Sequence, residues 1–168
     1  MSRFYIKSIG ASGPRVEYSQ VTFDAGVNIL HGPSNSGKSY VINCINFMFG
    51  ASEVPFTRLS TGYDTIHMTM ESLDGRTVQM TRRIIDDKSG KKSDVGENLV
   101  TVVSDFEDVN SNDYSISKLE YSDMLLKLMG IEERHQIISN KAFVPQNLTN
   151  RSFLHSYFID EDNIYEKI

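Results

Sequence analysis

The sequence predicts an α/β fold organised around a loop that binds phosphate. Residues 31–39 read His-Gly-Pro-Ser-Asn-Ser-Gly-Lys-Ser and match the pattern G-x-x-x-x-G-K-[ST] without exception. Residues 26–30 (Gly-Val-Asn-Ile-Leu) are expected to precede the loop as a short buried strand, and residues 40–49 follow it with helical spacing. A strand before the loop and a helix after it are the context in which this pattern holds phosphate.

The residue types in this loop explain its affinity for phosphate. Gly32 and Gly37 allow backbone conformations that a Cβ would forbid, so successive N–H groups can face phosphate oxygens. Lys38 brings a positive charge to the β- and γ-phosphates, and the Ser39 hydroxyl is placed to bind Mg²⁺. The candidate nucleotide-binding residues are therefore Gly32, Pro33, Ser34, Asn35, Ser36, Gly37, Lys38, Ser39 and Tyr40.

The other elements follow from hydrophobic periodicity and turn residues. Apolar side chains recur every three or four positions along residues 40–49, as on one buried helix face. A capping box at residues 117–120 begins a second helix that Gly130 ends, and residues 148–152 begin a third. Strands are expected at residues 3–9, 16–23, 26–30, 64–71, 76–84, 99–103 and 157–159. Together these elements predict a mixed β-sheet around the phosphate-loop helix.

The parity of apolar side chains defines the turn of the hairpin around residues 73–75. A three-residue loop with Gly75 in the left-handed conformation places Met68 opposite Met80. A two-residue Asp-Gly loop would instead pair apolar with polar side chains. We therefore predict the three-residue loop.

Composition and charge limit the classes of function. We interpret residues 1–168 as a single domain, because 39% hydrophobic and 23% charged residues are ordinary for a globular protein. The formal net charge of −5 argues against a surface that neutralises nucleic-acid phosphates over its whole extent. The one cysteine, Cys44, has no disulfide partner, and no leader or bilayer-spanning run is present. We therefore expect a cytoplasmic protein that does not contact a membrane.

Residues 86–94 carry no apolar side chain, so we expect a mobile surface loop. Its three lysines could touch DNA, but its three aspartates dilute the positive potential. A solvated loop between strands is the favoured interpretation.

Four stretches of the first fifty residues form a recognisable series. They are residues 6–9 (Ile-Lys-Ser-Ile), Arg15 in a short loop, residues 23–39 with the phosphate loop, and residues 45–50 (Ile-Asn-Phe-Met-Phe-Gly). SMC-family ATPase heads typically read F-K-S-F, a short arginine-bearing loop, G-F-x-x-I-x-G-P-N-G-S-G-K-S and a helix ending in F-x-x-G. The chain therefore resembles the N-terminal half of such a head, closely over these residues and loosely beyond them.

The resemblance implies the N-terminal lobe of an ABC-type P-loop ATPase with ATP and Mg²⁺ as ligands. In that family the C-terminal lobe carries the signature motif, the acidic Walker B strand and a switch histidine, and two heads enclose two ATP molecules. This sequence holds no L-S-G-G-type signature, no apolar run ending in paired acids and no heptads. The implied partners are a second ABC half or C-terminal lobe and a second head in a head-to-head dimer, with DNA as a further candidate.

The resemblance also suggests roles for single residues. Arg15 matches the arginine loop, which reaches toward nucleotide or DNA. The family's Q-loop glutamine follows a strand, and its position is matched either by Glu161, after residues 157–159, or by Gln146. Lys38, Glu161 and Gln146 are thus the candidate catalytic residues, and Ser39 and Glu161 the candidate metal ligands.

Several functions remain open at this point. The first is an SMC-like ATPase acting on DNA in repair, chromosome organisation or defence against foreign DNA, which hydrolyses ATP only when completed by a C-terminal lobe. The second is a small-molecule or nucleotide kinase, for which Arg82 and Arg83 are the only paired lid arginines, although both fall in an expected strand. The third is an ATP-gated dimerisation module that never hydrolyses. A GTPase is disfavoured, because Asn140-Lys141 lacks the following aspartate that recognises guanine.

Overall fold

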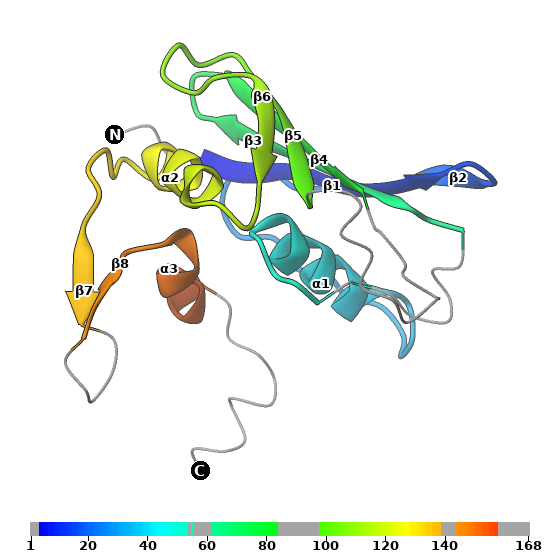
Figure 1. Ribbon diagram of the computed structural model, residues 1–168. Coiled ribbons are helices and arrows are strands. Elements are labelled where there is room, and N and C mark those ends of the chain that lie inside the picture. The colour runs from blue at the N-terminus through cyan, green and yellow to red at the C-terminus, as the bar shows by residue number, and fades with distance from the viewer. Residues whose placement is uncertain (1–3, 54, 56–61, 84–97, 139–143, 158–168) are drawn as a thin grey trace.

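A six-stranded antiparallel sheet with helices on one side forms the body of the molecule (Figure 1). The computed structural model describes residues 4–53, 55, 62–83, 98–138 and 144–157. The elements are β1 (Phe4–Gly13), β2 (Val16–Thr22), α1 (Lys38–Met48), β3 (Thr65–Ser72), β4 (Thr77–Arg83), β5 (Leu99–Ser104), β6 (Asn112–Ser115), α2 (Leu119–Leu128), β7 (Gln136–Ile138), β8 (Pro145–Asn147) and α3 (Asn150–Tyr157). The sheet order is β2-β1-β3-β4-β5-β6, and β7 and β8 form a separate hairpin.

The core lies between the inner face of this sheet and the helices. Alternate residues of the central strands point inward, because side chains along a strand face opposite sides of the sheet. The fully buried apolar residues of these strands are Ile66, Met68, Val78, Met80, Val100 and Val102, and α1 packs Cys44, Phe47 and Met48 against them. The helical stripe expected along residues 40–49 is therefore confirmed.

The predicted hairpin register is also confirmed. Met68 pairs with Met80 across β3 and β4, and Met70 pairs with Val78. Gly75 has a φ of +84°, the left-handed conformation required at the end of a three-residue loop.

The expected mixed sheet is wrong, because every described strand pair is antiparallel. The strand expected at residues 26–30 is absent as well. No described strand lies beside this segment to accept its backbone hydrogen bonds, and a strand needs such a neighbour. Its apolar side chains are exposed instead of buried, with Val27 at 96% and Ile29 at 83%.

The ends of other elements differ from expectation for local reasons. The capping box at residues 117–120 is wrong, since α2 begins after Lys118 and its N-terminus has no side-chain cap. The Ser117 hydroxyl pairs with the Ser115 hydroxyl at 2.9 Å instead. Gly130 ends the helix at φ +82°, as predicted.

Three further expectations concern the loops and the C-terminal part. Residue 157 belongs to α3, so the strand expected at 157–159 is wrong at its first residue. β6 lies at Asn112–Ser115, where no strand was expected, and Thr101 Oγ1 of β5 donates to Asp113 Oδ1 there at 2.6 Å. The expected mobile loop of residues 86–94 lies outside the described residues.

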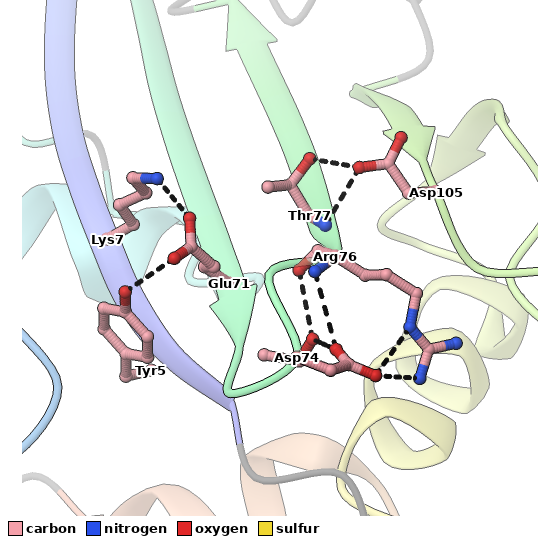
Figure 2. A network of polar contacts seen from close by, with 8 residues as sticks. Tyr5, Lys7, Glu71, Asp74, Arg76, Thr77 and Asp105 are labelled. Atoms are coloured by element: carbon pink, nitrogen blue, oxygen red, sulfur yellow. Dashed lines mark hydrogen bonds and ion pairs between the residues drawn. The ribbon is translucent and has the colours of Figure 1, made fainter.

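A polar network ties β1 to the β3–β4 hairpin at one end of the sheet (Figure 2). The Tyr5 hydroxyl donates to Glu71 Oε1 at 2.9 Å, and Lys7 forms an ion pair with the same carboxylate. Hydrogen bonds from Lys7 and Tyr5 lower the pKa of Glu71. Beside them, Asp74 accepts two hydrogen bonds from the Arg76 guanidinium, at 2.9 and 2.6 Å.

Arg82 is completely buried at the C-terminal end of α1. Its Nη1 donates to the carbonyl oxygen of Phe47 and, at 2.9 Å, to that of Ala51, while Nε donates to Asn98 Oδ1 at 3.0 Å. The guanidinium carbon lies 3.5 Å from the centroid of the Phe47 ring. Burial lowers the pKa of Arg82 to about 10, so the group keeps its charge at neutral pH, where the negative end of the helix dipole favours it.

Two more side chains donate hydrogen bonds to backbone carbonyl groups at the C-terminal end of α1. The buried Tyr121 hydroxyl donates to the carbonyl oxygen of Met48. Asn150 Nδ2 donates to the carbonyl oxygen of Phe49 at 2.9 Å. The C-terminal end of α1 is thus attached to β4, α2 and α3, and this attachment holds the helix under the sheet.

Candidate functional site

The phosphate-loop motif lies where the chain enters α1. Gly37 is the N-cap of the helix with a φ of +88°, and Asn35 also has a positive φ, of 62°. These left-handed residues curl the backbone of residues 32–37 into an exposed loop at the N-terminal end of α1 (Figure 1). Lys38 is the first residue of the helix, followed by Ser39 and Tyr40 in its first turn.

Lys38 spans the loop that precedes it. Its Nζ donates to the carbonyl oxygen of Gly32 at 2.8 Å and to that of Pro33 at 2.6 Å, and lies 3.3 Å from Ser36 Oγ. Its positive charge is therefore held at the mouth of the loop, where an anion would meet it.

The backbone at this point fits a phosphate group. No side chain caps the first turn of α1, so its amide groups remain available to an anion, and the helix dipole adds a partial positive charge there. A Cβ at Gly32 would lie 2.8 Å from Ser36 Oγ, so the close turn of the loop favours glycine. The Ser39 hydroxyl, exposed in the first turn, supplies an oxygen of the kind that Mg²⁺ prefers.

A cavity of about 700 Å³ lies beside the loop. Its walls combine residues 34–41 with side chains of β1, β2 and Tyr63, and Cys44 lies at its back. Pockets for small ligands commonly measure about 300–1,000 Å³. The space is therefore sufficient for a nucleotide whose phosphates reach the loop.

Polar groups of this cavity differ in their environments. Tyr63 and Ser19 hydroxyls are 2.6 Å apart. The Tyr40 hydroxyl is buried and has no hydrogen-bond partner among the described residues. Burial raises the pKa of Tyr40 and raises that of Cys44 to about 11, so both groups are neutral at physiological pH.

The remaining candidates lie away from the loop. Arg15 is exposed in the turn between β1 and β2 and does not line the cavity. Gln146 lies in β8, paired with Ile137, and Figure 1 shows that hairpin on the opposite side of the molecule from the phosphate loop. Glu161 lies outside the described residues. The structure thus brings together residues 34–40 of the predicted set at the cavity, and it does not bring Arg15 or Gln146 to them.

Sequence reasoning missed Ser19 and Tyr63 as cavity residues. The strand period offered a signal for Ser19, because it places Ser19 on the same side of β2 as the partly buried Val21. Nothing local indicates Tyr63, which reaches β2 from the start of the next strand. Arg82, considered above as a lid arginine, is buried in the core instead, and its position two residues after Met80 on the inner face of β4 was the signal for that.

Two features are absent from the described part of the chain. It holds no group of three or more His, Cys, Asp or Glu residues arranged to bind a metal ion. Among the described helices, none has the length and apolar character needed to cross a membrane.

Comparison with known proteins identifies a family. No curated protein and no solved structure matches the chain. A family model described as an AAA domain matches residues 5–164, which is nearly the whole sequence and includes the loop and cavity. AAA domains of this family occur in SMC-like ATPases, and they are P-loop nucleotide-binding domains. The chain belongs to this AAA domain family, and its N-terminal P-loop region is of the kind found in SMC-like ATPase heads.

Proposed function

We propose that the chain binds ATP with Mg²⁺ at the P-loop of residues 32–39, as the N-terminal lobe of an ABC-type, SMC-like ATPase head. The observation that carries this proposal is the Lys38 ammonium held across an exposed, glycine-turned loop at an uncapped helix N-terminus. Charge, backbone amides and helix dipole converge on one point there, and a polyphosphate is the ligand that uses all three.

Each residue of the loop has a defined task in this proposal. Lys38 exchanges its hydrogen bonds with the loop carbonyls for the β- and γ-phosphates, and the amides of residues 34–39 bind phosphate oxygens. Ser39 holds Mg²⁺, which, when bound, offsets phosphate charge. The cavity beside the loop takes part of the nucleotide surface out of water, which strengthens these polar contacts.

An exposed apolar segment supports the need for a second lobe. The apolar side chains of Val27 and Ile29 lie two positions apart, directly before the P-loop, and both are largely exposed to solvent. Burying such side chains stabilises a protein by about 1.5–3 kcal/mol each. We infer that a strand of a C-terminal lobe covers this segment, and that two completed heads then dimerise around ATP.

The kinase alternative is weaker. A kinase lid needs an exposed arginine that can close on the phosphates, whereas Arg82 is fully buried against Phe47. Arg83 is exposed but forms only a 4.0 Å ion pair with Asp64, and a single arginine at a strand end does not make a lid. A non-hydrolysing ATP-gated module remains the competing proposal. A role on DNA rests on the resemblance to SMC heads.

The test of nucleotide binding is calorimetric titration of ATP in the presence of Mg²⁺. Lys38→Ala removes charged hydrogen bonds worth about 1.5–3 kcal/mol each, so its affinity for ATP should fall at least tenfold. Lys127→Ala, which removes an exposed lysine from the last turn of α2, is the matched control and should leave the affinity unchanged. Equal affinity of the wild type and Lys38→Ala for ATP would contradict the proposal.

Hydrolysis separates the ATPase from the competing proposals. The chain alone should turn over ATP far more slowly than about 1 s⁻¹, the lower end of the usual enzyme range, because no carboxylate of the described residues lines the cavity to orient water. Turnover that appears only after a C-terminal lobe is added supports the ATPase. Turnover near 1 s⁻¹ by the chain alone favours a kinase-like enzyme. No turnover of ATP, either by the chain alone or with the C-terminal lobe, favours the non-hydrolysing ATP-gated dimerisation module.

The metal dependence of binding tests the two Q-loop candidates. A carboxylate near the γ-phosphate repels the nucleotide when Mg²⁺ is absent. If Glu161 occupies that position, Glu161→Gln should strengthen metal-free ATP binding and leave binding with Mg²⁺ nearly unchanged. If the substitution changes neither affinity, Glu161 does not face the metal. Gln146, which lies away from the loop in β8, is then tested by the same titration on Gln146→Ala.

A further inference from the structure

A second cavity lies at the opposite end of α1 from the P-loop. It is a groove of about 270 Å³ between residues 108–110 of the loop after β5, Tyr114 of β6, α2 and residues 131–134. The Tyr121 hydroxyl of α2 binds the carbonyl oxygen of Met48, and Figure 1 shows α2 at that end of α1. The groove shares no lining residue with the cavity beside the P-loop, so the two sites are separate.

The floor of this groove is apolar. Val109, Met124 and Leu126 line it and are themselves buried. Tyr114 and Ile131 are partly buried and complete the apolar lining. The volume lies just below the range of about 300–1,000 Å³ that is usual for pockets of small organic ligands. The groove therefore has room for one or two extended side chains of a ligand, and not for a larger group.

The rim of the groove is acidic, since five acidic and two basic residues line it. One acid and one base neutralise each other, because the Arg134 guanidinium donates to Asp123 Oδ2 at 2.9 and 2.6 Å. The four other carboxylates are exposed and form no ion pair with a described residue, and Lys127 is the one base of the described lining left to oppose them. These carboxylates belong to Asp108, Glu120, Glu132 and Glu133.

The electrostatics of the groove favour an extended organic cation. α2 ends at Leu128, and the carbonyl end of a helix carries a partial negative charge that adds to that of the carboxylates. No three acids of the described residues are arranged to bind one metal ion, so the carboxylates do not converge on a single point. Nucleic acid is repelled, because its phosphates are negative as well. A lysine or arginine side chain suits both parts of the groove, since its alkyl stem packs on apolar surface while its charged head stays at a polar rim.

We propose that this groove binds a basic segment of a partner protein, whose apolar side chains pack on the floor and whose lysine or arginine heads pair with the four carboxylates of the rim. Such a segment uses both properties of the groove, the apolar floor and the unopposed negative charge. The cavity beside the P-loop has the opposite character, because Lys38 is the only charged residue among its described lining. The partner would therefore bind at the buried end of α1 and leave the P-loop free, and the proposal does not depend on nucleotide binding.

The probe is a fluorescently labelled peptide in which leucine alternates with arginine, and its binding to the full chain is measured by fluorescence anisotropy at low ionic strength. Glu120→Gln combined with Glu132→Gln removes two carboxylates from the rim. Exposed ion pairs are individually weak, so the affinity for the peptide should fall by about 3- to 30-fold in this double variant. A peptide with glutamate in place of arginine should not bind the wild type. If the leucine–arginine peptide does not bind the wild type either, the proposal is overturned.

Glu17→Gln combined with Glu107→Gln is the matched control. This double variant changes the net charge by the same amount, and both residues are exposed. Glu107 is the neighbour of Asp108 in the sequence, but neither Glu107 nor Glu17 lines the groove. The control should bind the peptide as the wild type does. Equal losses of affinity in the two double variants would mean that the peptide follows the overall charge of the protein, and this would contradict the proposal.

Ile131→Ala tests the apolar part of the groove without a change of charge. It should weaken peptide binding by about 3- to 10-fold, because it removes apolar surface that the peptide covers. It should leave the affinity for spermine, a polycation without side chains, unchanged. If spermine displaces the peptide and Ile131→Ala changes neither affinity, the groove is a site for free polycations and the proposal is overturned. Thermal denaturation checks the fold of each variant. If Ile131→Ala does not fold, Ile131→Val, which removes one methyl group, replaces it in the same comparison.

Discussion

At its N-terminal end, α1 starts from a glycine with no side-chain cap, whereas at its C-terminal end three side chains from β4, α2 and α3 bind the carbonyl groups. The first end lies in solvent beside a cavity, and the second is buried under the sheet. Both ends of a helix leave backbone groups without partners inside the helix. In this protein the carbonyl end is satisfied from within the fold, and the amide end is left for a ligand. The difference indicates a helix that is anchored at one end so that the other can bind an anion without moving.

The largest expected effect comes from removing the buried anchor. Arg82→Ala removes the guanidinium donor from the carbonyls of Phe47 and Ala51, although Phe47 keeps its bond from the Gly50 N–H, and it empties the space over the Phe47 ring. We expect the free energy of unfolding to fall by about 3–5 kcal/mol in urea denaturation. Arg83→Ala, at the exposed neighbouring position, is the control and should change it by less than about 0.5 kcal/mol. If the free energy of unfolding fell by similar amounts in both variants, the contacts of Arg82 with the C-terminal end of α1 would not be what stabilises the fold.

A smaller loss is expected from the contact between α3 and α1. Asn150→Ala removes the partly buried hydrogen bond to the Phe49 carbonyl, and a hydrogen bond of this kind contributes about 0.5–1.5 kcal/mol. The same denaturation experiment measures it. Asn110→Ala, at an exposed position between β5 and β6, should have no measurable effect. An unchanged midpoint for Asn150→Ala would show that water replaces the amide at no cost.

At the open end, substitution should change binding more than stability. Gly37→Ala places a Cβ on a residue with φ +88°, which costs about 1–2 kcal/mol of stability through backbone strain alone, because nothing lies within 4 Å of that Cβ. It should also weaken triphosphate binding, since the loop amides diverge when Gly37 relaxes. Gly26→Ala, at φ +112° and also free of neighbours, carries a similar strain outside the P-loop. If Gly37→Ala and Gly26→Ala bind inorganic triphosphate with equal affinity in calorimetric titration, the left-handed backbone conformation of Gly37 is not required for anion binding.

The smallest expected effect is a pH dependence of stability, from the network of Figure 2 at the end of the sheet where β3 turns into β4. Hydrogen bonds to the carboxylates of Glu71, Asp74 and Asp105 lower the pKa of each. An unfolded carboxyl group takes up a proton near pH 4. The stability that these pairs contribute is therefore complete above that pH and is lost as the pH falls below it toward the lowered values.

Denaturation curves between about pH 2 and pH 7 measure this dependence. Glu71→Gln should flatten the acid limb, because the substituted amide does not titrate. An acid limb as steep as that of the wild type would assign the dependence to other carboxylates.

The sequence predicted the parts of the fold that depend on local pattern. The P-loop, the helix after it and the register of Met68 against Met80 all follow from residue types within a few positions of one another. Residues 26–30 mark the limit of this reasoning. Their alternation is that of a strand, but a strand also needs a neighbour, and pattern cannot say whether one is present.

The sequence also predicted only part of the candidate site. The loop itself could be read from its spacing, because its chemistry is carried by consecutive residues. Ser19 lies in β2 and Tyr63 in the segment before β3, and they meet because the backbones of Gly13 and Gly62 approach each other, a long-range contact that no motif encodes. Arg82 shows a different failure of sequence reasoning. Its charge suggests a place on the surface, but the alternation of side chains along β4 places it in the core.

The order of strands has a consequence for how the site opens. β1 pairs with β2 on one side and with β3 on the other, so the chain leaves the sheet after Phe23 and returns to it at Asp64, with the P-loop and α1 in between. The described residues between those two positions make none of the ladder hydrogen bonds of the sheet. Closing such a loop has an entropic cost that grows only slowly with its length. The P-loop and the first turn of α1 can therefore exchange their amide hydrogens by a local opening that leaves the sheet and the anchored end of the helix folded. A bound nucleotide would slow that exchange by the free energy of its binding.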